Sequence, residues 1–113
     1  MKRYRIANKR SKNKSVATLL YDELKHEFKI EIPKEQDVRK LPMLLRASVS
    51  KGIYVMNPEF SLLWVKNRLV PCERQNIGQF LKSYGLKNYR EDLIMEKTEG
   101  RSIQDDFVVI REQ

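Results

Sequence analysis

The stretch SVATLLYDELKHEFKIEIP, residues 15–33, decides how the chain begins to fold. Along residues 15–21 one set of side chains, Val16, Thr18 and Leu20, alternates with another, Ala17, Leu19 and Tyr21. Along residues 27–32 apolar side chains recur at every second position, and a period of two is that of a β-strand. The segment between the two runs is polar and can turn the chain, and Pro33 ends the second run because it lacks a backbone donor. We therefore expect a β-hairpin that pairs residues 15–21 with residues 27–32.

Beyond this hairpin the apolar spacing becomes helical. Pro42 suits the first turn of a short helix, and Asn57-Pro58-Glu59 is a stronger start, in which Asn caps, Pro takes the first helical position and Glu favours the positive end of the helix dipole. Two more helical patterns follow, one ending near Gly85 and the next near Gly100. Residues 107–110 are β-branched and aromatic, as in a strand. The order predicts an α+β fold with an N-terminal β-hairpin, three to four short helices and a C-terminal strand around one core.

Length and composition indicate one folded domain. The chain has 113 residues, of which 41% are hydrophobic and 34% charged, and this composition is typical of a globular protein. No apolar run approaches the roughly 18 to 20 residues that cross a bilayer. No apolar stretch follows the basic first residues before Val16, so we expect neither a secretory signal nor a membrane contact, and a cytoplasmic location.

The positive charge is concentrated at the N-terminus. Residues 1–14 contain seven basic residues and no acidic one, whereas residues 15–113 are nearly neutral. We expect residues 1–14 to form a flexible basic arm, with at most a brief extended piece, on a single α+β domain of residues 15–113. Such an arm is either a solvated tail or a contact site for DNA or RNA. The candidate nucleic-acid-binding residues are Lys2, Arg3, Arg5, Lys9, Arg10, Lys12 and Lys14.

Candidate catalytic groups are sparse. His26, the only histidine, is predicted in a polar turn, and Asp105 and Asp106 are adjacent, so on a strand they would point to opposite faces. Cys72 is the only cysteine and is expected to be a half-buried structural thiol. Phosphate-binding glycine loops and metallopeptidase motifs are missing from the sequence. We expect no enzyme, no metal site and no cofactor.

The densest constellation surrounds Pro71, at the junction of two predicted helices. Its members are Trp64, Arg68, Arg74, Gln75 and Asn76. An exposed tryptophan flanked by guanidinium groups is typical of an interface hot spot or a phosphate clamp. The alternative interpretation places Trp64 in the core and pairs Arg68 or Arg74 with Asp105 or Asp106.

The second half of the chain resembles a known family. The resemblance rests on these short motifs: Trp64-Val65, Asn67-Arg68-Leu69, Pro71, Arg74-Gln75-Asn76-Ile77, Gly85-Leu86, Tyr89, Gly100-Arg101-Ser102 and Asp105-Asp106-Phe107. They are similar to the small region that accompanies HipA-like serine/threonine kinases of bacterial toxin–antitoxin systems, either at the kinase N-terminus or as a separate small, HipS-like subunit. The resemblance implies a non-catalytic subunit that docks on a kinase-like partner, with Trp64, Arg68 and Arg74 as contact candidates.

Two function hypotheses follow. The first is a protein-binding regulatory subunit, antitoxin-like, of a HipA-like kinase or mobile-element system. The second is a nucleic-acid-binding accessory protein that uses its basic N-terminal arm. Binding driven by phosphate contacts weakens steeply with salt, whereas docking of an apolar face does not, so ionic strength separates the two.

Overall fold

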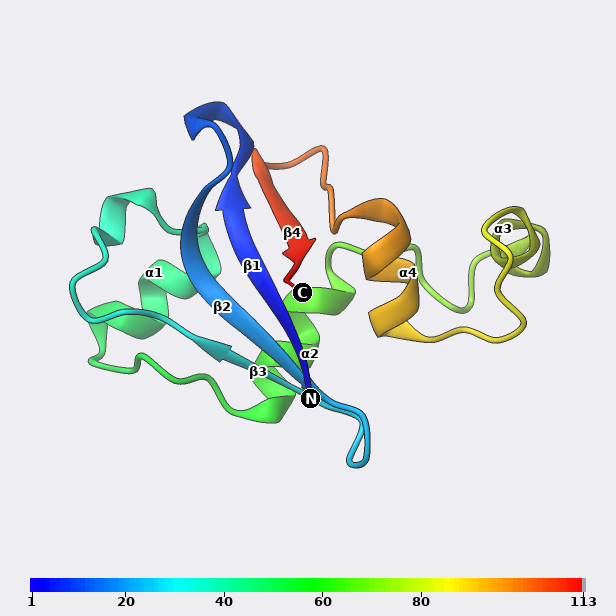
Figure 1. The fold of residues 1–113 in the computed structure, drawn as a ribbon, viewed down its shortest axis with the longest axis horizontal. Helices are drawn as coiled ribbons and strands as arrows, with labels where there is room; N and C mark the ends of the chain where they lie inside the picture. The colour runs from blue at the N-terminus through cyan, green and yellow to red at the C-terminus, as the bar shows by residue number, and fades with distance from the viewer. Residues whose placement is uncertain (113) are drawn as a thin grey trace.

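The computed structural model describes residues 1–112 and has an α+β fold, as the sequence predicted. Four antiparallel strands lie in the order β3-β2-β1-β4. Figure 1 shows this sheet and the helices around it. The strands are β1 (Lys2–Asn8), β2 (Lys14–Asp22), β3 (Glu27–Glu31) and β4 (Phe107–Arg111). The helices are α1 (Met43–Ser50), α2 (Pro58–Lys66), α3 (Ile77–Ser83) and α4 (Glu91–Thr98), with single 3₁₀ turns at Lys9–Ser11 and Val38–Lys40.

The local signals for the hairpin and for α2 are confirmed. β2 pairs with β3, and Tyr21 lies opposite Phe28. Asn57 caps α2, since its side-chain oxygen accepts a hydrogen bond from the backbone N–H of Phe60 at 2.7 Å, and Pro58 occupies the first helical turn. Both signals are local in sequence, so the chain needs no distant partner to obey them.

The prediction of a flexible N-terminal arm is wrong. Residues 2–8 form β1, which lies inside the sheet between β2 and β4. Tyr4 and Ile6 are completely buried. The alternation of Lys2, Tyr4 and Ile6 with arginines is the strand signal, and the high charge of the segment concealed it. A strand sends alternate side chains to opposite faces, so a basic segment is able to bury one face and keep its arginines on the other.

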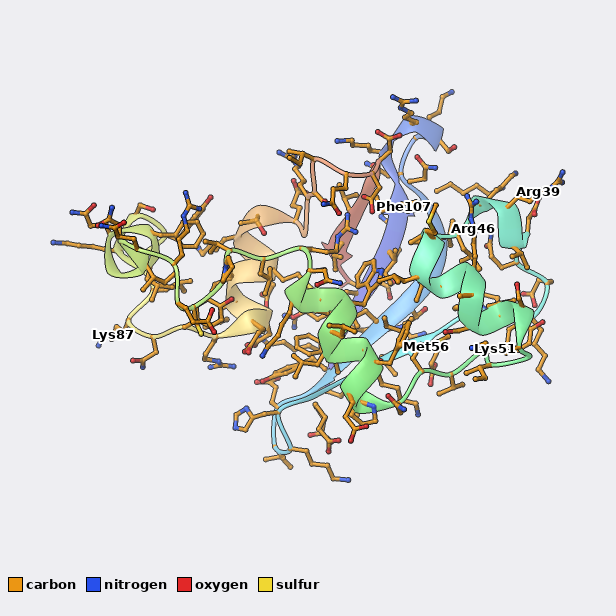
Figure 2. All side chains as sticks on the ribbon, turned by 180° about the vertical axis from the view of Figure 1, so that it is seen from behind. Arg39, Arg46, Lys51, Met56, Lys87 and Phe107 are labelled. Atoms are coloured by element: carbon orange, nitrogen blue, oxygen red, sulfur yellow. The ribbon has the colours of Figure 1, made fainter. Side chains whose placement is uncertain are left out.

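All the helices that pack on the sheet lie on one face. Ile6, Leu19 and Ile30 on that face contribute to the core together with Trp64 and Val65 of α2. Figure 1 looks onto the other, open face, and Figure 2, from behind, shows α1 and α2 lying across the sheet. No helix among residues 1–112 is long and apolar enough to cross a membrane.

The free edge of β3 is covered by the same chain. The backbone N–H of Ile32 donates to the Tyr54 carbonyl at 2.8 Å, and the N–H of Met56 donates to the Ile30 carbonyl at 2.9 Å. The buried Ser61 hydroxyl of α2 accepts the N–H of Ile30 at 3.1 Å. These bonds satisfy strand groups that would otherwise be open to pairing with another chain.

Candidate protein-binding site

Trp64 lies in the core. Its side chain sits on the sheet-facing side of α2 and is only 3% exposed. The guanidinium carbon of Arg68, one helical turn later, lies 4.8 Å from the centre of the indole ring, which is a cation–π contact. Trp64 is therefore not an exposed anchor. The alternative interpretation, which places Trp64 in the core, is right.

Arg68 is an internal ion-pair partner. Its two terminal nitrogens donate to both carboxylate oxygens of Asp105, at 2.9 and 2.7 Å, and further bonds reach the Gly100 and Phe107 carbonyls. Partial burial opposes ionisation of Asp105, but the hydrogen bonds from Arg68 and from the Phe107 N–H outweigh it and hold the pKa of Asp105 below its usual value. The Arg68 guanidinium is therefore engaged within this chain.

The Arg68–Asp105 pair closes the second edge of the sheet. Arg68 donates to the Phe107 carbonyl, and Asp105 accepts the Phe107 N–H at 3.0 Å. Next along β4, the N–H of Val109 donates to the Glu99 carbonyl at 2.7 Å. Both outward-facing backbone groups of Phe107 and the N–H of Val109 are thus occupied, which leaves less of this edge open to strand addition.

A groove of about 500 Å³ lies beside this pair, between the start of α1, the end of α2 and the segment that leads into β4. Met43 and Leu44 at its rim are exposed, and Asn67 and Gln104 add side-chain amides. Trp64 and Arg68 are also among the residues that line the groove. The groove has a mixed lining, in which half of the residues are apolar and half are polar or charged.

Arg74, Gln75 and Asn76 lie elsewhere, on the link that leads into α3, and all three are exposed. Within residues 1–112 none of the three side chains makes a hydrogen bond or an ion pair. We call residues 71–90 the α3 lobe. Figure 1 shows this lobe projecting from the body at one end of the molecule, and Figure 2 shows Lys87 on it. The structure therefore separates Arg74 from Trp64 and Arg68, although all three are close in sequence.

The α3 lobe is held by a few apolar anchors. Leu81 is buried, and Phe80 and Leu86 are partly buried against the core. The hydroxyl of Tyr89 donates to the Val70 carbonyl at 2.6 Å and ties the end of the lobe to its beginning. Phe80 and Tyr84 pack edge to face with ring centres 5.0 Å apart. These contacts fix the inner side of the lobe and leave its polar side chains outside.

Three of the seven predicted nucleic-acid-binding residues contact other groups of this chain. Lys2 is buried and donates to Asp92 at 2.8 Å and Glu96 at 2.9 Å. Arg3 pairs with Glu112 at 3.2 Å, and Arg5 donates to the backbone carbonyl of Asn13 at 3.2 Å. The other four, Lys9, Arg10, Lys12 and Lys14, are exposed where β1 turns into β2.

The acidic partners of Lys2 were not predicted from the sequence. Asp92 and Glu96 lie four positions apart on α4, so they share one face of that helix. Glu96 also accepts the Tyr4 hydroxyl at 2.8 Å, and burial together with this bond raises the pKa of Tyr4. The four-residue spacing was a usable signal, but nothing local indicated that β1 would lie beneath it.

The candidate catalytic groups do not meet one another. The Nδ1 atom of His26 lies 3.0 Å from the Tyr21 hydroxyl at the turn between β2 and β3, and Asp106 pairs with Arg10 at 2.9 Å. Cys72 is exposed, not half-buried, and hydrogen bonding to Glu73 raises the pKa of its thiol. Within residues 1–112 no three His, Cys, Asp or Glu side chains gather as metal ligands would.

Comparison with protein-family models, with curated proteins and with solved structures finds no match to this chain. The HipA-like resemblance therefore stays an expectation that rests on the sequence motifs alone.

Proposed function

We propose that this chain is a non-catalytic, protein-binding regulatory subunit and that the α3 lobe is its docking element. One observation carries the proposal: the lobe projects from the body and exposes Arg74, Gln75 and Asn76, which have no side-chain partner within residues 1–112. Polar and guanidinium groups left free on a fixed support are suited to specify a partner.

The charge of the lobe indicates the chemistry of that partner. Residues 71–90 contain four basic side chains and one acidic side chain, Glu73. Arg74, Lys82 and Lys87 are exposed, whereas Arg90 pairs with the buried Asp92 at 2.9 Å. Charge complementarity then favours an acidic surface on the partner and raises the association rate.

The aromatic content of the lobe supports a protein partner. Tyr84 is 36% exposed, and its ring packs against that of Phe80. Tyrosine and arginine are the residue types enriched where protein interfaces gain most of their binding energy. An anchored aromatic group beside free guanidinium and amide groups therefore fits a protein surface.

The resemblance to the HipA-like accessory region suggests which protein to test. Its motif Arg74-Gln75-Asn76-Ile77 leads into α3 within the lobe, so the partner we propose is a HipA-like kinase that the chain restrains or completes. The exposed part of this motif, rather than Trp64 or Arg68, would contact that kinase.

The test is co-purification of the full chain with the HipA-like kinase of the same genome, followed by a binding titration. Arg74→Glu with Lys87→Glu reverses two charges on the lobe and should weaken binding more than about tenfold, because like charges would then face each other. Arg39→Glu with Lys51→Glu reverses the same two residue types near the two ends of α1, away from Lys87 (Figure 2), and should leave affinity within about twofold. Absence of a complex, or equal loss in both variants, would overturn the proposal.

A further inference from the structure

The turn between β1 and β2 is another exposed basic surface, and it lies apart from the α3 lobe (Figure 1). We call residues 8–15, NKRSKNKS, the basic hairpin tip. It carries Lys9, Arg10, Lys12 and Lys14, all exposed, and no acidic residue. Four cations at the end of one hairpin make a local positive field that a nearly neutral body does not cancel.

Hydrogen bonds hold the basic hairpin tip in one shape. The side chain of Asn8 accepts the N–H of Arg10 at 2.9 Å, and the N–H of Asn13 donates to the Asn8 carbonyl at 3.0 Å. Lys12 and Asn13 adopt left-handed conformations, with φ of 56° and 59°, which close the turn. The cations are thus presented from a fixed backbone, so binding has less backbone entropy to remove.

The charges of the tip are largely unpaired. Within residues 1–112 neither Lys9, Lys12 nor Lys14 forms an ion pair. Arg10 pairs with Asp106 at 2.9 Å, but its side chain is 79% exposed, so water screens the pair and a stronger anion can displace it. The tip therefore presents at least three free cations to a ligand.

The composition of the tip selects among anionic partners. Residues 8–15 contain only lysine, arginine, serine and asparagine, with no apolar or aromatic side chain. A protein interface needs apolar or aromatic anchors at its centre, and an interfacial membrane contact needs apolar side chains that enter the acyl boundary. Lysine, arginine, serine and asparagine are the side chains that bind phosphate and sugar along nucleic acids.

We propose that the basic hairpin tip is a sequence-independent contact site for the phosphodiester backbone of a nucleic acid. This site is separate from the α3 lobe and does not rest on the proposed kinase partner. The predicted contact site was a flexible arm with seven basic residues. The proposed site is a hydrogen-bonded turn with four of them. Lys2 is buried in ion pairs with Asp92 and Glu96, and Arg3 and Arg5 lie on β1, outside the tip.

The test measures binding of the full chain to labelled DNA and RNA duplexes of about 20 base pairs, at about 50 mM salt and upward. The tip variant is Lys9→Gln, Lys12→Gln and Lys14→Gln, and the control is Lys25→Gln, Lys34→Gln and Lys51→Gln. All six lysines are exposed, so both variants lose the same charge, and thermal melts check that both stay folded.

We expect the tip variant to bind more than about tenfold more weakly, with the slope of log affinity against log salt reduced by about 0.9 for each phosphate that the tip no longer neutralises. The control should bind within about twofold of the parent. Tighter binding to one duplex shows whether the ligand is DNA or RNA. Equal affinity for the DNA and RNA duplexes supports recognition of the phosphodiester backbone that both share. Equal weakening in both variants, no binding by the parent, or binding to anionic vesicles but to neither duplex would overturn the proposal.

Discussion

Arg68 and Asp105, 37 positions apart in the chain, form a two-pronged ion pair with nitrogen–oxygen distances of 2.9 and 2.7 Å. The pair joins the end of α2 to the segment before β4, and the guanidinium also holds the Gly100 and Phe107 carbonyls. Four hydrogen bonds from one side chain make Arg68 a structural clip. The arginine that the sequence offered as a partner contact therefore stabilises the sheet edge.

Removing this clip should destabilise the protein. Arg68→Ala leaves a half-buried carboxylate and two carbonyls without their donor, so we expect the free energy of unfolding to fall by roughly 2 to 4 kcal/mol. The control is Arg74→Ala, at an exposed position, which should change it by less than about 0.5 kcal/mol. Chemical denaturation of both variants measures the difference, and similar values for the two would contradict the assignment.

The same pair predicts part of the acid sensitivity. The pKa of Asp105 is lowered from its ordinary value of 3.8, so its contribution is complete above that pH and is lost as the pH falls through the lower folded-state value. Asp105→Asn has no carboxyl group to titrate. We expect unfolding free energy measured between about pH 5 and pH 2 to fall less steeply for this variant than for the parent. Parallel curves would show that Asp105 has the same pKa in the folded and unfolded chain.

Deletion of residues 1–8 should unfold the chain. β1 supplies the buried Tyr4 and Ile6 and, within residues 1–112, is the only strand that pairs with β4. Its removal exposes the core and leaves two strands with free edges. Circular dichroism and a thermal melt check this expectation. A truncated chain that still melts cooperatively would mean that β1 is dispensable.

Gly100 should not tolerate a side chain. Its φ is +58°, and a Cβ added there would lie 2.7 Å from a methyl group of Val109. We expect Gly100→Ala to lower the free energy of unfolding by roughly 2 to 4 kcal/mol, from left-handed strain plus overpacking. Gly85→Ala is the matched control, since its φ is +71° with open space around it, and it should lose only about 1 kcal/mol. Equal losses would show that Val109 moves aside at little cost.

The local elements were predictable from sequence. The alternation along residues 15–33 and the Asn57-Pro58 start correspond to β2, β3 and α2, because strand periodicity and helix capping act between near neighbours. The apolar run at residues 107–110 corresponds to β4. The α+β class followed from their order.

Only the tertiary structure decided the contacts of Lys2, Arg68 and Arg74. Lys2 looked like a mobile cation and is buried against Asp92 and Glu96, while Arg68 looked like a partner contact and holds Asp105. Arg74 is exposed on the link that leads into α3. The energy of a charge depends on its distance from other charges and from water, and those distances are set when segments 37 to 94 positions apart meet.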